Sequence, residues 1–227
     1  ETLLSELSLM TVGYMHFAIE HLHGHHWNVS TPKDPASSRL GESFYAFWPR
    51  TVVYSYLGAW EIENKRIAKK NLGFFQNKMI YYTILPFLFA IACSIFFESS
   101  KVFTFWAWQS VVAFTLLELV NYIEHYGLQR KEISPGMYEK VTPMHSWNAP
   151  YSITNYYLFK LQRHSDHHAY PTRQYQILRT FAESPLMPTG YAGMVVLALF
   201  PPLFFRVMDP LVEEINKRKA SDEAKCK

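Results

Sequence analysis

Two apolar runs joined by a very short polar turn limit what this chain can fold into more than any other feature. They cover Met79–Phe97 and Val102–Val120, and the first contains no ionisable side chain apart from tyrosines and Cys93. Each run has about 19 residues, close to the ~20 that a helix needs to cross a bilayer core. We therefore expect a transmembrane hairpin. Two buried helices of a soluble bundle are the alternative, but such helices normally keep a polar stripe.

Basic residues surround the two open ends of this hairpin. Lys65, Arg66, Lys69 and Lys70 precede it and Arg130 and Lys131 follow it, whereas its turn contains only Lys101. Because cytoplasmic loops carry the excess of Lys and Arg, both open ends are expected on the cytoplasmic side. Glu118, near the end of the second run, indicates a protected polar interior.

Histidines are concentrated in two short motifs, at 20–26 and 161–169, which together hold seven of the ten in the chain. On a helix, His21 and His25 are four residues apart, and His164 precedes His167 and His168 by three and four residues, so their rings share a face. The hairpin returns the chain to His125, which is therefore expected on the same side of the membrane as the segment before Met79, where the motif at 20–26 lies. The candidate metal ligands are His21, His25, His26, His125, His164, His167 and His168.

Seven imidazoles are more than one ion with open substrate positions would use, so we expect two metal ions. Imidazole binds iron, copper, zinc and nickel, and the pattern alone does not choose among them. Glu20, Glu124 and Asp166 lie beside the histidines. They are either partners that orient the rings, occasional direct ligands, or ordinary carboxylates at helix ends.

Two further histidines are expected to have other roles. His16 stands off the face of the first motif, and we interpret it as a packed histidine bonded to a carbonyl. His23 is two residues from both His21 and His25, and is expected to face away from them.

The remaining chain is expected to be mainly helical. We expect a helix over 2–20, then a loop from Trp27 that covers or borders the metal site, and an aromatic-rich helix over Phe44–Ile67. After the hairpin, we expect loop structure over 129–160 that ends in a short helix at Tyr151–Lys160. The last apolar run, Tyr191–Phe205, is expected to be an interfacial or re-entrant helix. The predicted fold class is all-α: an integral-membrane helical bundle with a histidine-rich cytoplasmic metal site.

Cysteine and charge content exclude two classes of site. Cys93 and Cys226 lie far apart, so the chain cannot build a disulfide framework or a four-cysteine zinc site. The formal net charge of +3 is small and dispersed, with no basic stripe among aromatic residues, so nucleic acid is not an expected partner.

Three motifs carry a resemblance to a known family. Glu20-His21-x-x-Gly24-His25-His26, Asn121-Tyr122-Ile123-Glu124-His125-Tyr126-Gly127-Leu128 and Leu161-Gln162-Arg163-His164-Ser165-Asp166-His167-His168-Ala169 resemble the signatures of bacterial membrane alkane 1-monooxygenases, the rubredoxin-dependent alkane hydroxylases. The likeness includes Thr142-Pro143-Met144-His145-Ser146-Trp147-Asn148 and extends over essentially the whole chain.

The resemblance implies a multi-pass enzyme of the bacterial inner membrane with its active site facing the cytoplasm. Members of the family hold two non-haem iron ions with nine histidines in a six-helix bundle. They convert medium- or long-chain n-alkanes to 1-alkanols with O2 and electrons from rubredoxin, separate or fused, in contact with membrane lipid. The alternatives are a related diiron desaturase or hydroxylase acting on acyl chains, and an inactive metal-binding fragment. No substrate-binding residue can be named.

One departure from the family pattern affects the expected domain organisation. The upstream box of the type His-Glu-x-x-x-His has no equivalent here, so residues 1–212 are expected to be the C-terminal part of the hydroxylase domain, with the upstream part of the same enzyme as a partner. Residues 213–227 are expected to be a charged tail. Because Glu223–Lys227 resembles the opening of a rubredoxin, this tail is also a candidate linker to a fused rubredoxin.

Overall fold

The computed structural model describes residues 2–225, and within them the expectation of a mainly helical chain is confirmed. The helices are α1 (Thr2–Thr11), α2 (Phe17–Glu20), α3 (His26–Asn28), α4 (Phe44–Lys69), α5 (Lys78–Phe96), α6 (Ser100–His125), α7 (Ser152–Tyr157), α8 (His164–Ala169), α9 (Tyr191–Ala198) and α10 (Pro201–Lys225). Shorter turns are the π-helical η1 (His21–His25) and the 3₁₀ turns η2 (Phe74–Gln76), η3 (Pro143–His145) and η4 (Tyr175–Ile177). Cys226 lies outside the described residues.

The chain forms two compact units. Unit 1 comprises Glu1–Trp27 and Trp48–Glu118, and unit 2 comprises Asn28–Phe47 and Leu119–Lys227. The division falls inside α4 and α6, so each of these helices contributes to both units.

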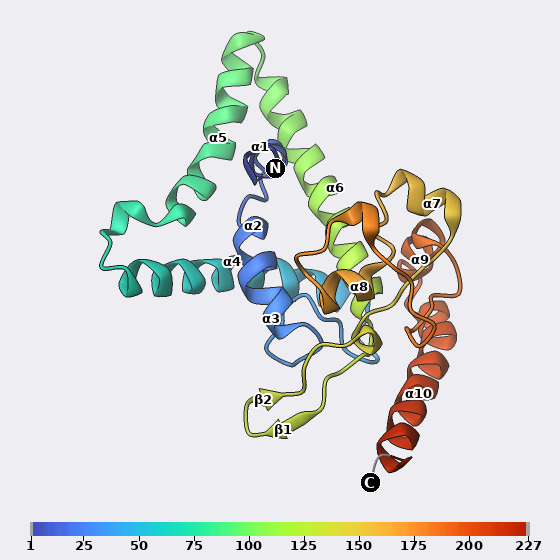
Figure 1. Cartoon of the computed structure of the whole chain (residues 1–227). Coiled ribbons are helices and arrows are strands. Elements are labelled where there is room, and N and C mark those ends of the chain that lie inside the picture. The colour runs from blue at the N-terminus through green and yellow to red at the C-terminus, as the bar shows by residue number, and fades with distance from the viewer. Residues whose placement is uncertain (1, 226–227) are drawn as a thin grey trace. The chain divides into compact units, whose positions relative to one another are not determined.

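Helices α5 and α6 correspond to the predicted apolar runs, and a turn of three residues joins them at one end (Figure 1). Both are long and apolar enough to cross a membrane. Only 22% and 17% of their most apolar windows are buried within the chain, so most of their apolar surface is open to other contacts. Helix α6 continues past Val120 to His125, which places that histidine at the last residue of the helix.

The expected single helix over 2–20 is wrong, because the chain breaks near Gly13. Gly13 has a φ of +65°, a left-handed conformation that glycine adopts without steric cost. A Cβ atom at this position would lie 3.3 Å from Cζ2 of Trp106. The break separates α1 from α2, and the chain enters the histidine motif through the four residues of α2.

The core of unit 1 gathers around the start of α5. Met15, Ile19, Ala59, Met79 and Tyr82 pack together there and are buried.

Glu118 is buried in unit 1, as predicted for a protected polar interior. Its carboxylate accepts hydrogen bonds from the hydroxyl groups of Tyr14, at 2.8 Å, and Thr51, at 3.0 Å.

In unit 2, the loop before α4 packs on the end of α6. The hydroxyl of Ser38 donates to the carbonyl of Tyr122 at 2.6 Å, and the N–H of Gly127 donates to the carbonyl of Ser38 at 3.0 Å. The loop therefore borders the segment that carries His125, as expected.

A small β-ribbon and a divided C-terminal segment depart from expectation. Strands β1 (Glu132–Ser134) and β2 (Met137–Tyr138) are antiparallel, within a region expected to be loop. Gly136 allows the tight turn between them with a φ of +76°. The apolar run Tyr191–Phe205 is divided between α9 and α10, and α10 continues without a break across position 212 into the charged tail.

Candidate metal centre

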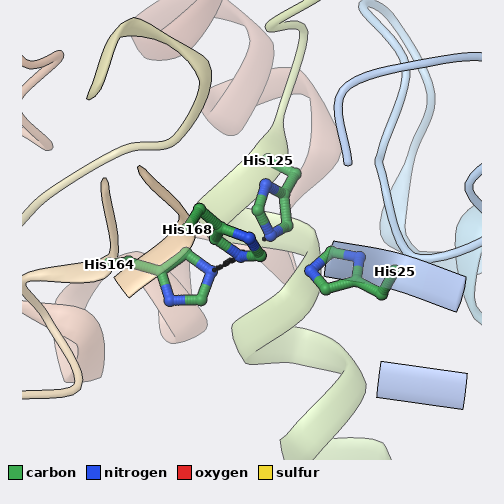
Figure 2. A group of neighbouring side chains, drawn as sticks. All are labelled: His25, His125, His164 and His168. Atoms are coloured by element: carbon green, nitrogen blue, oxygen red, sulfur yellow. Dashed lines mark hydrogen bonds between the residues drawn. The ribbon is translucent and has the colours of Figure 1, made fainter. Parts of the chain in front are cut away.

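Three imidazoles from α6 and α8 meet in the interior of unit 2. His125, His164 and His168 are 0–2% exposed, and their ligand atoms lie within 4.8 Å of one another. Nε2 of His164 lies 3.1 Å from Nε2 of His125 and 2.8 Å from Nε2 of His168 (Figure 2). The predicted helical spacing of four residues thus brings two rings of α8 together, and α6 supplies the third.

The donor set of this triad fits a metal ion. Two imidazole nitrogens bound at about 2.1 Å to one ion, at right angles, lie about 3 Å apart. Nε2 of His164 has two nitrogen neighbours at hydrogen-bond distance, yet an imidazole nitrogen can donate only one hydrogen. A cation among the three Nε2 atoms would satisfy all of their lone pairs at once.

A carboxylate and a tyrosine fix the orientation of His164. Nδ1 of His164 lies 3.2 Å from Oε1 of Glu124, which is 1% exposed. The hydroxyl of Tyr191 donates a hydrogen bond to the same oxygen. Burial and the adjacent Glu124 raise the pKa of Tyr191 well above its ordinary value, so the phenol keeps its proton. A carboxylate at Nδ1 favours the tautomer that leaves Nε2 available for metal.

Among the described residues, the partners of the Asp166 carboxylate are two arginines and not a histidine ring. It is fully buried, Nη1 of Arg173 pairs with its Oδ1, and the backbone N–H of Arg179 donates to Oδ2 at 2.8 Å. Both guanidinium groups also lie over the ring of Tyr170, at 4.3 and 5.5 Å from its centroid. These contacts fold the segment after α8 back onto the helix.

Asn148 secures the N-terminal end of α8. Its Oδ1 accepts from the N–H of Ser165 at 2.9 Å, and its Nδ2 donates to the hydroxyl of Ser165 at 2.6 Å. Its own backbone bonds to Pro185 and Met187, each at 2.8 Å. A helix of only six residues has little stability of its own, so side-chain contacts of this kind must hold it in place.

The first histidine motif, in unit 1, forms a π-helical turn instead of the expected α-helix. The N–H of His26 bonds to the carbonyl of His21, five residues earlier. This wider turn brings the ring centroid of His26 to 4.7 Å from that of His21, and the ring of His25 lies 5.2 Å from that of His21. All three predicted ligands of the motif are therefore neighbours.

Each motif contains both buried and half-buried imidazoles. His25 is fully buried, whereas His21 and His26 are half-buried, with ligand atoms within 4.8 Å of each other. In α8, His164 and His168 are buried but His167 is half-buried, and its ring centroid lies 5.7 Å from that of His164.

Glu20 and Gly24 form a close pair beside the first motif. Glu20 is 2% exposed, and a Cβ atom at position 24 would lie 2.7 Å from its Oε1. Glycine at position 24 therefore makes room for a buried carboxylate next to three imidazoles.

The two other histidines of this region behave largely as predicted. His23 is exposed, in line with the expectation that it is not a ligand. His16 is packed between the rings of Tyr14 and Tyr56, and burial lowers its pKa to about 4. Its Nε2 has no hydrogen-bond partner among the described residues, so the expected bond to a carbonyl is not seen at that atom.

Sequence reasoning missed three residues that support the site: Tyr191, Arg173 and Asn148. Tyr191 opens an apolar run, and nothing in that run marks it as a polar partner. Arg173 follows the motif in a segment without periodicity. Asn148 belongs to a motif of the resemblance, and its polar side chain before a short helix is the one signal that the sequence offers.

An apolar cleft of about 630 Å³ lies in unit 1 along the hairpin. Its walls include Phe89, Cys93, Phe97, Phe105 and Trp106. Apolar walls of this kind suit an alkyl chain.

A family model described as fatty acid desaturase matches residues 2–198 of the chain. The chain belongs to the fatty acid desaturase family. Within this family it is similar to alkane 1-monooxygenase 2 of Pseudomonas aeruginosa, with 50% identity over 208 residues that cover 91% of this chain and 55% of the relative. The alkane 1-monooxygenase of Acinetobacter baylyi is 46% identical over 217 residues, covering 95% and 53% of the two chains.

A more distant relative carries a different substrate in its name. The xylene/toluene monooxygenase hydroxylase component of Pseudomonas putida is 25% identical over 220 residues, which cover 96% of this chain and 58% of the relative. The resemblance of this desaturase-family chain to alkane 1-monooxygenases is confirmed by these similarities. The chain spans about half the length of the curated relatives it matches.

Proposed function

We propose that these residues belong to an alkane 1-monooxygenase that converts n-alkanes to 1-alkanols with O2. Because the chain spans about half the length of the relatives it matches, the activity is proposed for a protein that contains these residues. The observation that carries the proposal is the buried triad of His125, His164 and His168, whose donor set fits a metal ion, in a chain 50% identical to an alkane 1-monooxygenase.

The proposed centre contains two non-haem iron ions. The seven proposed ligands are His21, His25, His26, His125, His164, His167 and His168. In both motifs, some of these imidazoles are buried and others are half-buried, which supports one buried ion and one that is closer to solvent. Glu124, Asp166 and Glu20 are proposed to orient the ligands. Iron bound there would supply the reductive activation of O2 that insertion of one oxygen atom into a C–H bond requires.

The overall reaction consumes the alkane, O2, two electrons and two protons, and yields the 1-alkanol and water. We propose rubredoxin, separate or fused, as the electron donor. The residues 1–212 are proposed as part of the hydroxylase domain and 213–227 as a tail or linker. Burial of the triad excludes bulk water, which protects an oxidising site from side reactions.

We also propose that α5 and α6 cross the bacterial inner membrane with both open ends of the hairpin in the cytoplasm. Their length, composition and open apolar surface support a membrane span. An alkane has no polar group, so its recognition must come from apolar walls, and the cleft beside Phe105 and Trp106 is a candidate.

Product analysis tests the activity. The complete protein, reconstituted with rubredoxin, its reductase and NADH, is expected to form 1-alkanol from an n-alkane, with one atom of ¹⁸O from labelled O2. The preparation should contain close to two irons per polypeptide by metal analysis. His168→Ala should abolish product, whereas His23→Ala should retain most activity. Stoichiometric zinc without O2 consumption would instead indicate a metal-binding protein without this activity.

A second candidate is a related membrane enzyme that acts on acyl chains. The fatty acid desaturase family match favours it. The same preparation incubated with an acyl substrate distinguishes the two, since a desaturase leaves a double bond in the acyl chain and forms no alkanol.

A further inference from the structure

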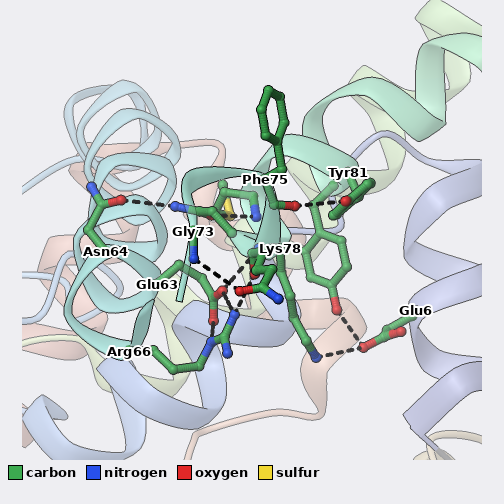
Figure 3. A network of polar contacts seen from close by, with 12 residues as sticks. Glu6, Glu63, Asn64, Arg66, Gly73, Phe75, Lys78 and Tyr81 are labelled. Carbon is green, nitrogen blue, oxygen red and sulfur yellow. Dashed lines mark hydrogen bonds and ion pairs between the residues drawn. The ribbon is translucent and has the colours of Figure 1, made fainter. Parts of the chain in front are cut away.

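The connection between α4 and α5 is built on a buried ion pair. Glu63 is 3% exposed and accepts hydrogen bonds from Nε and Nη2 of Arg66, both at 2.8 Å, and from the backbone N–H of Lys78 at 3.0 Å (Figure 3). Nη2 of Arg66 also donates to the carbonyl of Gln76 at 2.8 Å. Burial acts to raise the pKa of Glu63, but these bonds and the charges of Arg66 and Lys78 outweigh it and lower the pKa. The carboxylate therefore stays ionised and ties the end of α4 to the start of α5.

Asparagine side chains complete this connection. Nδ2 of Asn77, a fully buried residue, donates to Oδ1 of Asn64 at 2.9 Å. Oδ1 of Asn77 accepts from the N–H of Met79 at 2.8 Å and so caps α5. The segment between the two helices thus has a defined conformation.

Two phenylalanines project from this fixed connection. Phe74 and Phe75 are 61% and 77% exposed, and their ring centroids lie 5.8 Å apart. In Figure 3, the ring of Phe75 points away from the polar network, while its carbonyl accepts a hydrogen bond from the hydroxyl of Tyr81 at 2.7 Å. Phenylalanine side chains held outward at the start of an apolar helix are placed to enter the boundary between headgroups and acyl chains, as the Trp, Phe and Leu side chains of interfacial helices do.

The same segment carries an excess of positive charge. Residues 61–78 contain five basic and two acidic side chains, so their net charge of +3 equals that of the whole chain. Lys65, Arg66 and Lys78 face Glu61, Glu63 and Glu6 at 2.5, 2.8 and 3.8 Å. Lys69 and Lys70 are exposed and have no ion pair among the described residues. Their charges are available to an anionic partner.

We propose that the α4–α5 connection binds the headgroups of anionic phospholipids at the membrane surface. Lys69 and Lys70 contact the lipid phosphates, and Phe74 and Phe75 enter the interfacial layer. The inference rests on the membrane span of α5 proposed above. Lipid is favoured over an acidic protein because the outward aromatic pair adjoins an apolar helix whose surface is open.

Lipid retention tests this assignment. The full chain is placed in nanodiscs with equal amounts of phosphatidylglycerol and phosphatidylcholine, released gently, and analysed for retained lipid by native mass spectrometry. The wild-type chain is expected to retain phosphatidylglycerol preferentially. Because each basic residue near the surface adds about 1 kcal/mol of attraction, K69Q/K70Q should lower this preference by about 30-fold. F74S/F75S should lower retention of both lipids and leave their ratio nearly unchanged.

A matched control distinguishes a specific site at Lys69 and Lys70 from a general effect of the chain's positive charge. K140Q/K217Q removes the same charge at two other exposed lysines and should leave the preference unaltered. Equal retention of the two lipids by the wild-type chain, or an equal loss in K140Q/K217Q, would overturn the proposal. Displacement of retained lipid by inorganic phosphate in large excess would also overturn it, since it would identify a phosphate site.

The result can be distinguished from failure of the proposed function. If alkaline carbonate extracts the chain from membranes, the proposed membrane span fails, and the lipid site fails with it. If the chain stays in the membrane without lipid preference, only the lipid site fails. If the chain retains phosphatidylglycerol but the complete protein has no hydroxylase activity, the lipid site is supported and the proposed function fails.

Discussion

Nδ1 of His164 lies 3.2 Å from Oε1 of Glu124, the residue immediately before His125. Two consecutive residues at the end of α6 therefore serve one site in different ways: His125 presents Nε2 to the triad, and Glu124 orients the ring of a second member. Because Tyr191 donates to the same carboxylate oxygen, a segment 67 residues later in the chain also controls this ring.

Removal of the Tyr191 hydroxyl should weaken metal binding more than it weakens the fold. Tyr191→Phe deletes a hydrogen bond to the carboxylate that orients His164, and loss of such partners typically costs 10- to 100-fold in metal affinity. Iron retained against a chelator series, measured by mass spectrometry, checks this. Tyr126→Phe is the control, since it deletes a bond of 2.7 Å to Asp209 and one of 2.8 Å from the N–H of Gly41, and among the described residues neither partner contacts a histidine of the triad. Equal iron loss in both variants would refute a specific role.

Arg173→Ala should destabilise the chain strongly. Among the described residues it leaves the fully buried carboxylate of Asp166 with Arg179 as its one remaining partner, and breaking a buried pair costs about 3–5 kcal/mol when no second partner remains. We expect a loss of about 2–4 kcal/mol. Thermal unfolding in detergent measures the change. Arg218→Ala, at an exposed pair with Glu214, should change stability by less than about 1 kcal/mol, and a similar effect of the two variants would contradict the prediction.

Gly24→Ala should disturb the first histidine motif although alanine favours helix. Its Cβ would lie 2.7 Å from Oε1 of Glu20, so the buried carboxylate must move, at a cost of about 1–3 kcal/mol. Gly58→Ala is the matched control, because its nearest neighbour would be Cγ of Glu20 at 3.9 Å, and it should be neutral or stabilise by up to about 1 kcal/mol. Melting temperatures and iron content of the two variants compare them. A stabilised Gly24→Ala variant with full iron content would show that the site tolerates the methyl group.

His145 should make unit 2 sensitive to acid. Burial, together with the charge of Lys219, lowers its pKa to about 4, although Glu139 acts in the opposite direction. The folded state therefore binds this proton less tightly than the unfolded state, whose histidine titrates near 6.5. The contribution of neutral His145 to the free energy of unfolding is therefore fully present above about pH 6.5. It falls by about 2 kcal/mol as the pH is lowered to 5. Unfolding followed over this range should show a weaker slope in His145→Gln, whereas the exposed His23→Gln should keep the wild-type slope.

The sequence was most informative where composition and spacing act locally. The apolar runs predicted α5 and α6 to within a few residues, and the four-residue spacing of His164 and His168 predicted their neighbouring rings. The buried environment of Glu118 also followed, because a carboxylate near the end of an apolar run needs polar partners.

Other features could not be read from the sequence because they depend on contacts between distant segments. The break at Gly13 is stabilised beside Trp106, and the ring of His164 is oriented through Tyr191, which no local pattern connects to it. The β-ribbon at 132–138 is too short and too exposed to give an alternating pattern. Likewise, nothing in the spacing of the first motif distinguishes an α-turn from a π-turn.

The π-turn at His21–His25 acts as a one-residue insertion into a helix. Five residues separate His21 from His26, a distance that would place their side chains on different sides of an α-helix, but the extra residue in the turn returns them to neighbouring directions. The turn therefore absorbs one extra residue without separating the histidines. Deletion of one residue, such as Leu22, would convert the π-turn into an α-turn and leave His21 three and four residues before the other two ligands, still on one face, so related chains can differ here by one residue in length and keep the ligands together.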